Sequence, residues 1–231
     1  MIKKIVGLIL CCGMMVSPVF GVNYKSEYID SQKERIEKSG IVKEFNVVWE
    51  DFDKNRDYSE RDYIGFYSSL LMMPEYVVDS FIMSGWEFHI SDVELGKIDE
   101  FREYGSGVVG LSDFDKEEIW VYKGDWVFNK QTVIHEMGHF VELCMVGDGI
   151  SDEDFVRERD KLIEIIRKYA GSSRNEAYAE IWYEICKYDG NLDRDGLREL
   201  MEGCTGCFEE VYEDWLRFER FDSEGVRVRG V

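Results

Sequence analysis

The chain has 231 residues, of which 45% are hydrophobic and 14% aromatic, and its formal net charge at pH 7 is −20. A chain of this length and composition is globular rather than disordered and can bury one good core. Its strong negative charge excludes nucleic acid and anionic membrane surfaces as partners, because like charges repel.

The N-terminus has the three parts of a secretory signal peptide. Lys3 and Lys4 give a positive start, residues 5–16 are apolar, and Gly21 ends a stretch suited to cleavage. The apolar run is too short for a membrane-spanning helix. We therefore predict a signal peptide over residues 1–21 and a secreted, extracellular protein without stable membrane insertion after cleavage.

Cleavage leaves residues 22–231, which contain no repeat, low-complexity tract or linker. We predict that they form a single domain, monomeric, with its core at about 41–218. Anchoring through a lipidated Cys11 is the lesser alternative, because Leu10 stands where lipoproteins have a small residue.

The first half of the mature chain alternates between helical and strand patterns. Polar and apolar residues alternate in the two predicted strands, and Pro74 and Gly85 bracket one predicted helix. We expect a surface helix, a strand, two helices and a second strand at 26–40, 42–49, 59–72, 75–83 and 86–90. His89 lies on the polar face or edge of the last strand, and we predict that it is structural rather than a metal ligand.

A polar connection over 91–106 leads into a glycine-rich stretch, and a short apolar strand follows at 119–122. We predict a strand and turn made of Gly107, Val108, Val109, Gly110 and Leu111. This stretch is not a phosphate-binding loop, since it lacks the Gly-Lys-Ser/Thr ending and a following helix.

Two of the three histidines in the chain lie four residues apart in a helical pattern. His135 and His139 would share one face of that helix and could bind one Zn²⁺. Glu136 would project beside the metal, where it could take a proton from a zinc-activated water in peptide hydrolysis. The alternative is a core helix with two satisfied histidines, which the scarcity of histidine elsewhere disfavours.

The rest of the chain reads as helical. We expect helices at 151–169, 173–187, 195–201 and 206–219, and a loose polar tail after Phe221. The predicted fold class is therefore α+β and zincin-like, with a small mixed sheet and an HExxH helix packed against a C-terminal helical part.

A catalytic zinc needs three protein ligands and an open position. No third histidine follows the motif, so we expect an acid. Glu176 and Glu180 share one face of the 173–187 helix, and small Ala177 and Ala179 let this helix approach a neighbour closely. The alternative is a solvated acidic face, which is common in a chain with 48 acidic residues.

Four cysteines remain after the predicted cleavage: Cys144, Cys186, Cys204 and Cys207. An even number in an exported protein suggests disulfides, with three possible pairings. Alternatively, Cys204-x-x-Cys207 could be half of a zinc knuckle or could join the two histidines in a structural zinc site.

Together, HEMGH at 135–139, Tyr169 and EAYAE at 176–180 resemble the anthrax lethal factor-like zinc peptidases. In size and layout the chain is most similar to the small secreted Pro-Pro endopeptidases of that family. The family has HExxH, a tyrosine seven residues before the third ligand, and Glu-x-x-Ala-Glu.

The resemblance implies a role for each matching residue. His135, His139 and Glu176 would hold one Zn²⁺ per chain, and Glu180 would accept a hydrogen bond from a zinc-bound histidine. Tyr169 would stabilise the oxyanion of the reaction.

These expectations describe a secreted, gluzincin-like zinc endopeptidase with Glu136 as general base. A protein or peptide substrate would lie extended along residues 107–111 by strand addition. The alternative is a catalytically inactive zincin-fold binding or toxin-accessory module. The intact Glu136 argues against it, because inactive relatives of enzymes commonly lose the base.

Overall fold

The computed structural model of the chain describes residues 26–53, 57–124 and 130–225. The predicted signal peptide lies outside the described residues. The described residues divide into two compact units, those within 26–71 and 85–133 and those within 72–84 and 134–225. The single metallopeptidase domain over residues 22–231 stays a prediction.

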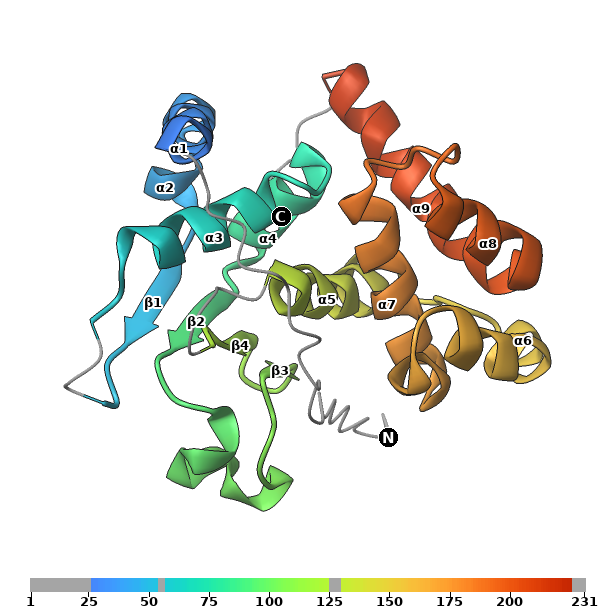
Figure 1. Ribbon diagram of the computed structural model, residues 1–231, viewed down its shortest axis with the longest axis horizontal. Helices are drawn as coiled ribbons and strands as arrows, with labels where there is room; N and C mark the ends of the chain where they lie inside the picture. The colour runs from blue at the N-terminus through green and yellow to red at the C-terminus, as the bar shows by residue number, and fades with distance from the viewer. Residues whose placement is uncertain (1–25, 54–56, 125–129, 226–231) are drawn as a thin grey trace. The chain divides into compact units, whose positions relative to one another are not determined.

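The first unit is built on a four-stranded mixed sheet with strand order β1-β2-β4-β3 (Figure 1). Both β1/β2 and β2/β4 pair in parallel, and β3 pairs with β4 antiparallel. This arrangement confirms the predicted α+β class with a small mixed sheet. The elements of this unit are α1 (Ser26–Ser39), α2 (Ile41–Glu44), β1 (Val47–Glu50), α3 (Glu60–Leu70), β2 (Glu87–Ser91), η1 (Leu95–Lys97), η2 (Asp99–Tyr104), β3 (Gly110–Asp113) and β4 (Glu118–Tyr122).

Side chains alternate between the two faces of the sheet along each strand, and both faces are covered. On one face Phe88 packs against Phe66 of α3, with ring centroids 5.1 Å apart. On the other face Trp120 belongs to a buried cluster with Leu95, Phe101, Val108 and Leu111. The core of this unit therefore lies on both sides of β2 and β4.

Two predicted strands begin later than the sequence suggested. The strand predicted at 42–49 is β1 alone, because Ile41–Glu44 folds as the short helix α2 after Gly40, whose φ is +74°. The strand predicted at 107–111 begins at Gly110, because Gly107 has a φ of +89°, outside the range of a β-strand.

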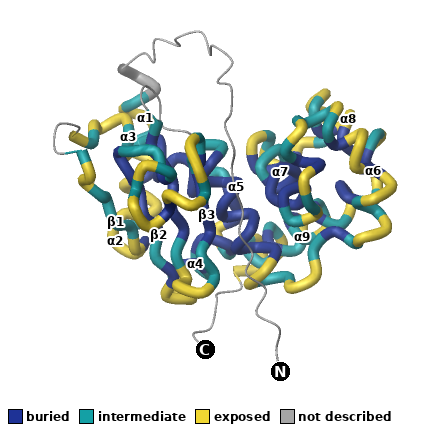
Figure 2. Tube along the Cα trace, turned by 90° about the horizontal axis from the view of Figure 1, so that it is seen from below, coloured by how far each residue is buried: buried dark blue, intermediate teal, exposed yellow. Residues whose placement is uncertain are grey.

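The second unit is helical. Helix α5 (Lys130–Phe140) enters it at Ile134 and continues as a π-helical turn, η3 (Val141–Val146), which ends at Gly147. The other elements are α4 (Glu75–Ser84), α6 (Asp152–Ile165), η4 (Lys168–Gly171), α7 (Arg174–Lys187), α8 (Asp195–Gly203) and α9 (Thr205–Ser223). Figure 2 shows much of α7 as buried chain. Among the described residues, no helix has the length and apolar character needed to span a bilayer.

Two predicted helix ends in this unit were wrong. The helix predicted over 151–169 stops at Ile165, because Arg167 has extended backbone and residues 168–171 form a separate 3₁₀ turn. The last helix runs to Ser223, past the predicted end at 219, so the chain directly after Phe221 is helical rather than loose.

Three of the cysteines are buried free thiols: Cys186, Cys204 and Cys207. The expected disulfide pairing among these three is therefore absent. Burial raises the pKa of Cys204 to about 11 and that of Cys207 still further, so neither thiol is a thiolate at neutral pH. No cysteine joins a candidate metal group among the described residues, which argues against the structural zinc alternative.

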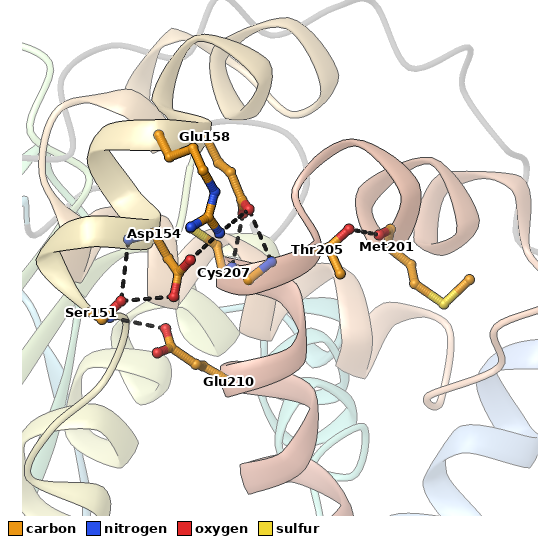
Figure 3. Close-up of polar contacts among 9 residues, drawn as sticks. Ser151, Asp154, Glu158, Met201, Thr205, Cys207 and Glu210 are labelled. Atoms are coloured by element: carbon orange, nitrogen blue, oxygen red, sulfur yellow. Dashed lines mark hydrogen bonds and ion pairs between the residues drawn. The ribbon is translucent and has the colours of Figure 1, made fainter.

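A buried acid on α6 holds the start of α9 (Figure 3). The two carboxylate oxygens of Glu158 accept hydrogen bonds from the backbone N–H groups of Gly206 and Cys207, at 3.0 and 2.9 Å. Burial opposes ionisation, but the Cys207 N–H, the Arg157 guanidinium and the Gly206 N–H together lower the pKa of Glu158. An ionised Glu158 thus caps a helix N-terminus, where negative charge is stabilising.

We expect Glu158→Ala to lower the free energy of unfolding by about 1–3 kcal/mol at pH 7, because the buried N–H group of Cys207 and the half-buried N–H group of Gly206 lose their acceptor. The lowered pKa makes this contribution complete above the unfolded value of about 4.3, and it is lost as the pH falls through the folded value. Urea unfolding followed by circular dichroism should therefore show a difference from wild type that shrinks in acid. Glu164→Ala, at an exposed site of α6, is the control, and equal effects of the two variants would contradict this account.

Candidate metal centre

Two helices of the second unit bring three potential ligand atoms together. His135 and His139 lie on α5, and their Nε2 atoms are 3.1 Å apart. Glu176 lies on α7, and its Oε2 is 3.1 Å from His135 Nε2 and 3.7 Å from His139 Nε2. All three residues are buried, so these atoms form one enclosed group.

The spacing of these atoms fits a metal ion. Zinc bonds of about 2.0–2.1 Å in a tetrahedron place neighbouring ligand atoms about 3.3 Å apart, close to the three observed separations. Glu176 Oε2 is also buried without a hydrogen-bond donor of suitable geometry among the described residues. A buried carboxylate oxygen is costly unless a charge or donor satisfies it, and a cation at this position would do so.

The charge state of Glu176 suits a ligand. Burial opposes its ionisation, but the imidazoles of His135 and His139 more than compensate and lower the pKa to about 2. The carboxylate is therefore ionised at neutral pH.

A second buried acid orients one of the histidines. Glu180 Oε1 is 2.7 Å from His135 Nδ1, on the opposite side of the ring from the ligand atom. Burial opposes ionisation of Glu180, but His135 and Arg167 outweigh it and lower the pKa. An ionised Glu180 at this distance favours the tautomer with the proton on Nδ1, which leaves the lone pair of Nε2 directed at the ligand group.

Arg167 is a residue of the centre that the sequence did not single out. Its guanidinium pairs with Glu180 Oε1, although Glu180 is fully buried. The sequence could have indicated Arg167, because a buried carboxylate requires a counter-charge and Arg167 stands two residues before Tyr169.

The structure also places Tyr169 at the centre. Its hydroxyl donates a hydrogen bond of 2.8 Å to Glu176 Oε1, and its ring centroid lies 5.9 Å from that of His135. The turn that carries it, η4, ends at Gly171, where a Cβ atom would lie 2.3 Å from Ile163 Cγ1. Only glycine fits there, so the turn can pack against α6.

Glu136, the expected general base, is fully buried on α5 next to His135. The predicted substrate strand belongs to the first unit. Gly110 and Leu111 lie in β3, which is at the end of the strand order. Val108 is buried in the Trp120 cluster and Gly107 is in the preceding turn, so only the end of the predicted stretch is strand.

The ligand group exists because α5 and α7 approach each other closely. A Cβ atom on Gly138 would lie 2.9 Å from Ala179 Cα and 3.2 Å from Trp182 Cδ1. Ala177 and Ala179 are fully buried, in line with the expectation that small residues allow a close approach. Gly138 itself is the smallest partner in this contact.

We expect Gly138→Ala to force the two helices apart. Alanine normally stabilises a helix by up to about 1 kcal/mol relative to glycine, but overpacking here should cost about 1–3 kcal/mol. The affinity for Zn²⁺ should fall roughly 10–100-fold, as when contacts around metal ligands are disturbed. Isothermal titration calorimetry measures this affinity, and thermal unfolding measures the stability.

Gly196→Ala in α8 is the matched control, because its nearest new contact is the edge of the Tyr188 ring at 3.3 Å. If Gly138→Ala bound zinc as tightly as this control, the contact between α5 and α7 would not set the geometry of the centre.

Comparisons with known proteins support the fold. No protein-family model matches the chain, and no curated protein matches it in sequence. Among solved structures, it is similar to the Pro-Pro endopeptidase PPEP-2 from Paenibacillus alvei, with a TM-score of 0.50 and 15% identity. The match covers 75% of this chain and 98% of that one. At this identity the likeness shows a peptidase-like fold alone.

Proposed function

We propose that this protein is a zinc-dependent endopeptidase of the gluzincin type, related to the lethal factor-like peptidases. The observation that carries the proposal is the buried group of His135, His139 and Glu176, in which an HExxH helix meets an acid from a second helix. Its fold is similar to that of a solved Pro-Pro endopeptidase, which supports the proposal.

In this proposal His135 Nε2, His139 Nε2 and Glu176 hold one catalytic Zn²⁺. When bound, zinc supplies a Lewis acid that polarises a carbonyl group and acidifies water. Histidine and carboxylate ligands at tetrahedral spacing are the donor set that zinc prefers.

Residues of the chain perform the other steps of the reaction. The carboxylate of Glu136 takes a proton from the attacking water and passes it to the leaving amine. Glu180 keeps the proton of His135 on Nδ1, and Arg167 keeps Glu180 ionised inside the protein. The Tyr169 hydroxyl, which donates to Glu176 in this structure, serves as the donor for the oxyanion that develops on the substrate.

The substrate is a protein or peptide, bound in extended form by strand addition along residues 107–111. The position of β3 at the end of the strand order, where it pairs only with β4 among the described strands, supports this proposal. The predicted signal sequence at residues 1–21 supports secretion, and the protein acts as a monomer.

Glu136→Gln should keep its zinc and its fold but lose hydrolysis of a combinatorial peptide library, because only the proton acceptor changes. Mass spectrometry of the cleaved peptides measures activity, and metal analysis measures zinc. Glu153→Gln, an exposed acid of α6, is the control. A Glu136→Gln protein that cleaves at the wild-type rate would refute the mechanism, and a wild-type protein that cleaves nothing would favour an inactive binding module.

Tyr169→Phe should lower kcat about 10²–10³-fold with little change in KM, since the oxyanion exists in the transition state and not in the ground state. The lost hydrogen bond to Glu176 should cost about 1 kcal/mol of stability. Steady-state kinetics on one good peptide substrate gives both constants. An unchanged kcat would leave Tyr169 as a packing residue, and a raised KM alone would make it a substrate-binding residue.

A further inference from the structure

A second group of potential ligands lies in the first unit, on one face of the sheet. The register of the parallel strands places Glu87 of β2 opposite Glu118 of β4, and His89 opposite Trp120. Residues two apart on a strand point to the same face, so these four side chains are neighbours. One ligand atom from each of Glu87, His89 and Glu118 lies within 4.8 Å of the others.

The ring of His89 is held in one orientation. Its Nδ1 is 2.9 Å from Glu50 Oε1 on β1, and its plane stacks on Trp120 with centroids 4.1 Å apart and an interplanar angle of 11°. The residue is only 7% exposed. With Nδ1 held by a carboxylate, Nε2 is the nitrogen available to a ligand, as in carboxylate–histidine–zinc arrangements.

That nitrogen lacks a hydrogen-bond partner. Nε2 of His89 is buried, and no described residue donates to it or accepts from it. Its nearest acidic atom is Glu87 Oε2, 3.6 Å away, which is too long for a hydrogen bond. A buried polar atom in this state requires an explanation, and a bound cation between these two atoms supplies one.

Each of the two acids keeps an oxygen for a ligand. Glu87 Oε1 accepts a hydrogen bond from Asn46, and Glu118 Oε2 accepts one from the indole N–H of Trp120, both at 2.9 Å. Neither acid forms a salt bridge with a lysine or arginine of the described chain. With Glu50, three carboxylates thus surround one imidazole, an excess of negative charge that a divalent cation would neutralise.

We propose that His89 Nε2, Glu87 and Glu118 form a second metal site, which binds a divalent transition-metal ion of the zinc type. One imidazole and two carboxylates suit zinc better than calcium or magnesium, which prefer oxygen alone. The ion links β2 to β4, so the role of the site is to stabilise the sheet. His89 is then a ligand, contrary to the prediction from the sequence.

The test counts zinc ions per chain by native mass spectrometry after saturation with ZnCl₂ and gel filtration. The full chain should carry two, and His139→Ala should carry one. Glu87→Gln and Glu118→Gln should each carry one, while Glu117→Gln, which removes the same charge beside Glu118, should carry two. Glu87→Gln guards against misfolding, because the Glu87 side chain is 46% exposed.

In the His139→Ala background, zinc should also raise the melting temperature, and Glu118→Gln should abolish that rise. The inference fails if Glu87→Gln and Glu118→Gln keep the same zinc count as Glu117→Gln. That result is expected if a protonated His89 bridges the two acids without a metal ion. A single zinc lost only in His139→Ala would overturn this second site and leave the proposed function standing. A single zinc lost only in Glu118→Gln would support this second site and overturn the zinc centre of the proposed function.

Discussion

The metal centre depends on the contact between α5 and α7 at Gly138 and Ala179. The ligands come from both helices, so the distance between the helix axes decides whether the Glu176 carboxylate reaches the two imidazoles. There is no room for a Cβ atom on Gly138, and Trp182 closes the contact one turn further along α7. A packing constraint between small residues therefore sets the geometry of a charged site.

That geometry places buried acids next to buried histidines, so each ionised acid needs a partner inside the protein. Glu176 and Glu180 lie four residues apart on α7, and each faces His135 from a different side of the ring. Arg167 supplies the counter-charge for Glu180 from the extended segment before η4. Removing any member of such a chain leaves a buried charge without its partner, which is more costly than the loss of one contact.

The sequence predicted the local parts of this site well. His135 and His139 are four residues apart in one helix, so their spacing was sufficient to place both on one face. The acid ligand was harder, because helical spacing put Glu176 and Glu180 on the same face and did not choose between them. The structure separates them by distance, since Glu176 reaches both Nε2 atoms whereas Glu180 contacts Nδ1 of His135.

The parts that the sequence missed depend on backbone conformation or tertiary pairing. The extended backbone of Arg167 splits one predicted helix and turns Tyr169 toward Glu176, and no helical period signals such a break. His89 looked isolated along the chain, and only the register between β2 and β4 brings it beside Glu118. The predicted strand at 107–111 failed at Gly107 because a residue's φ cannot be read from an apolar pattern.

The central claim is that His135, His139 and Glu176 share one zinc ion, and anomalous X-ray diffraction from crystals of the zinc-loaded protein tests it most directly. Data collected on both sides of the zinc absorption edge locate zinc independently of any assumed mechanism. We predict a peak bonded to both Nε2 atoms and to a Glu176 oxygen at about 2.0–2.2 Å. The absence of a peak between these residues in zinc-loaded crystals would contradict it.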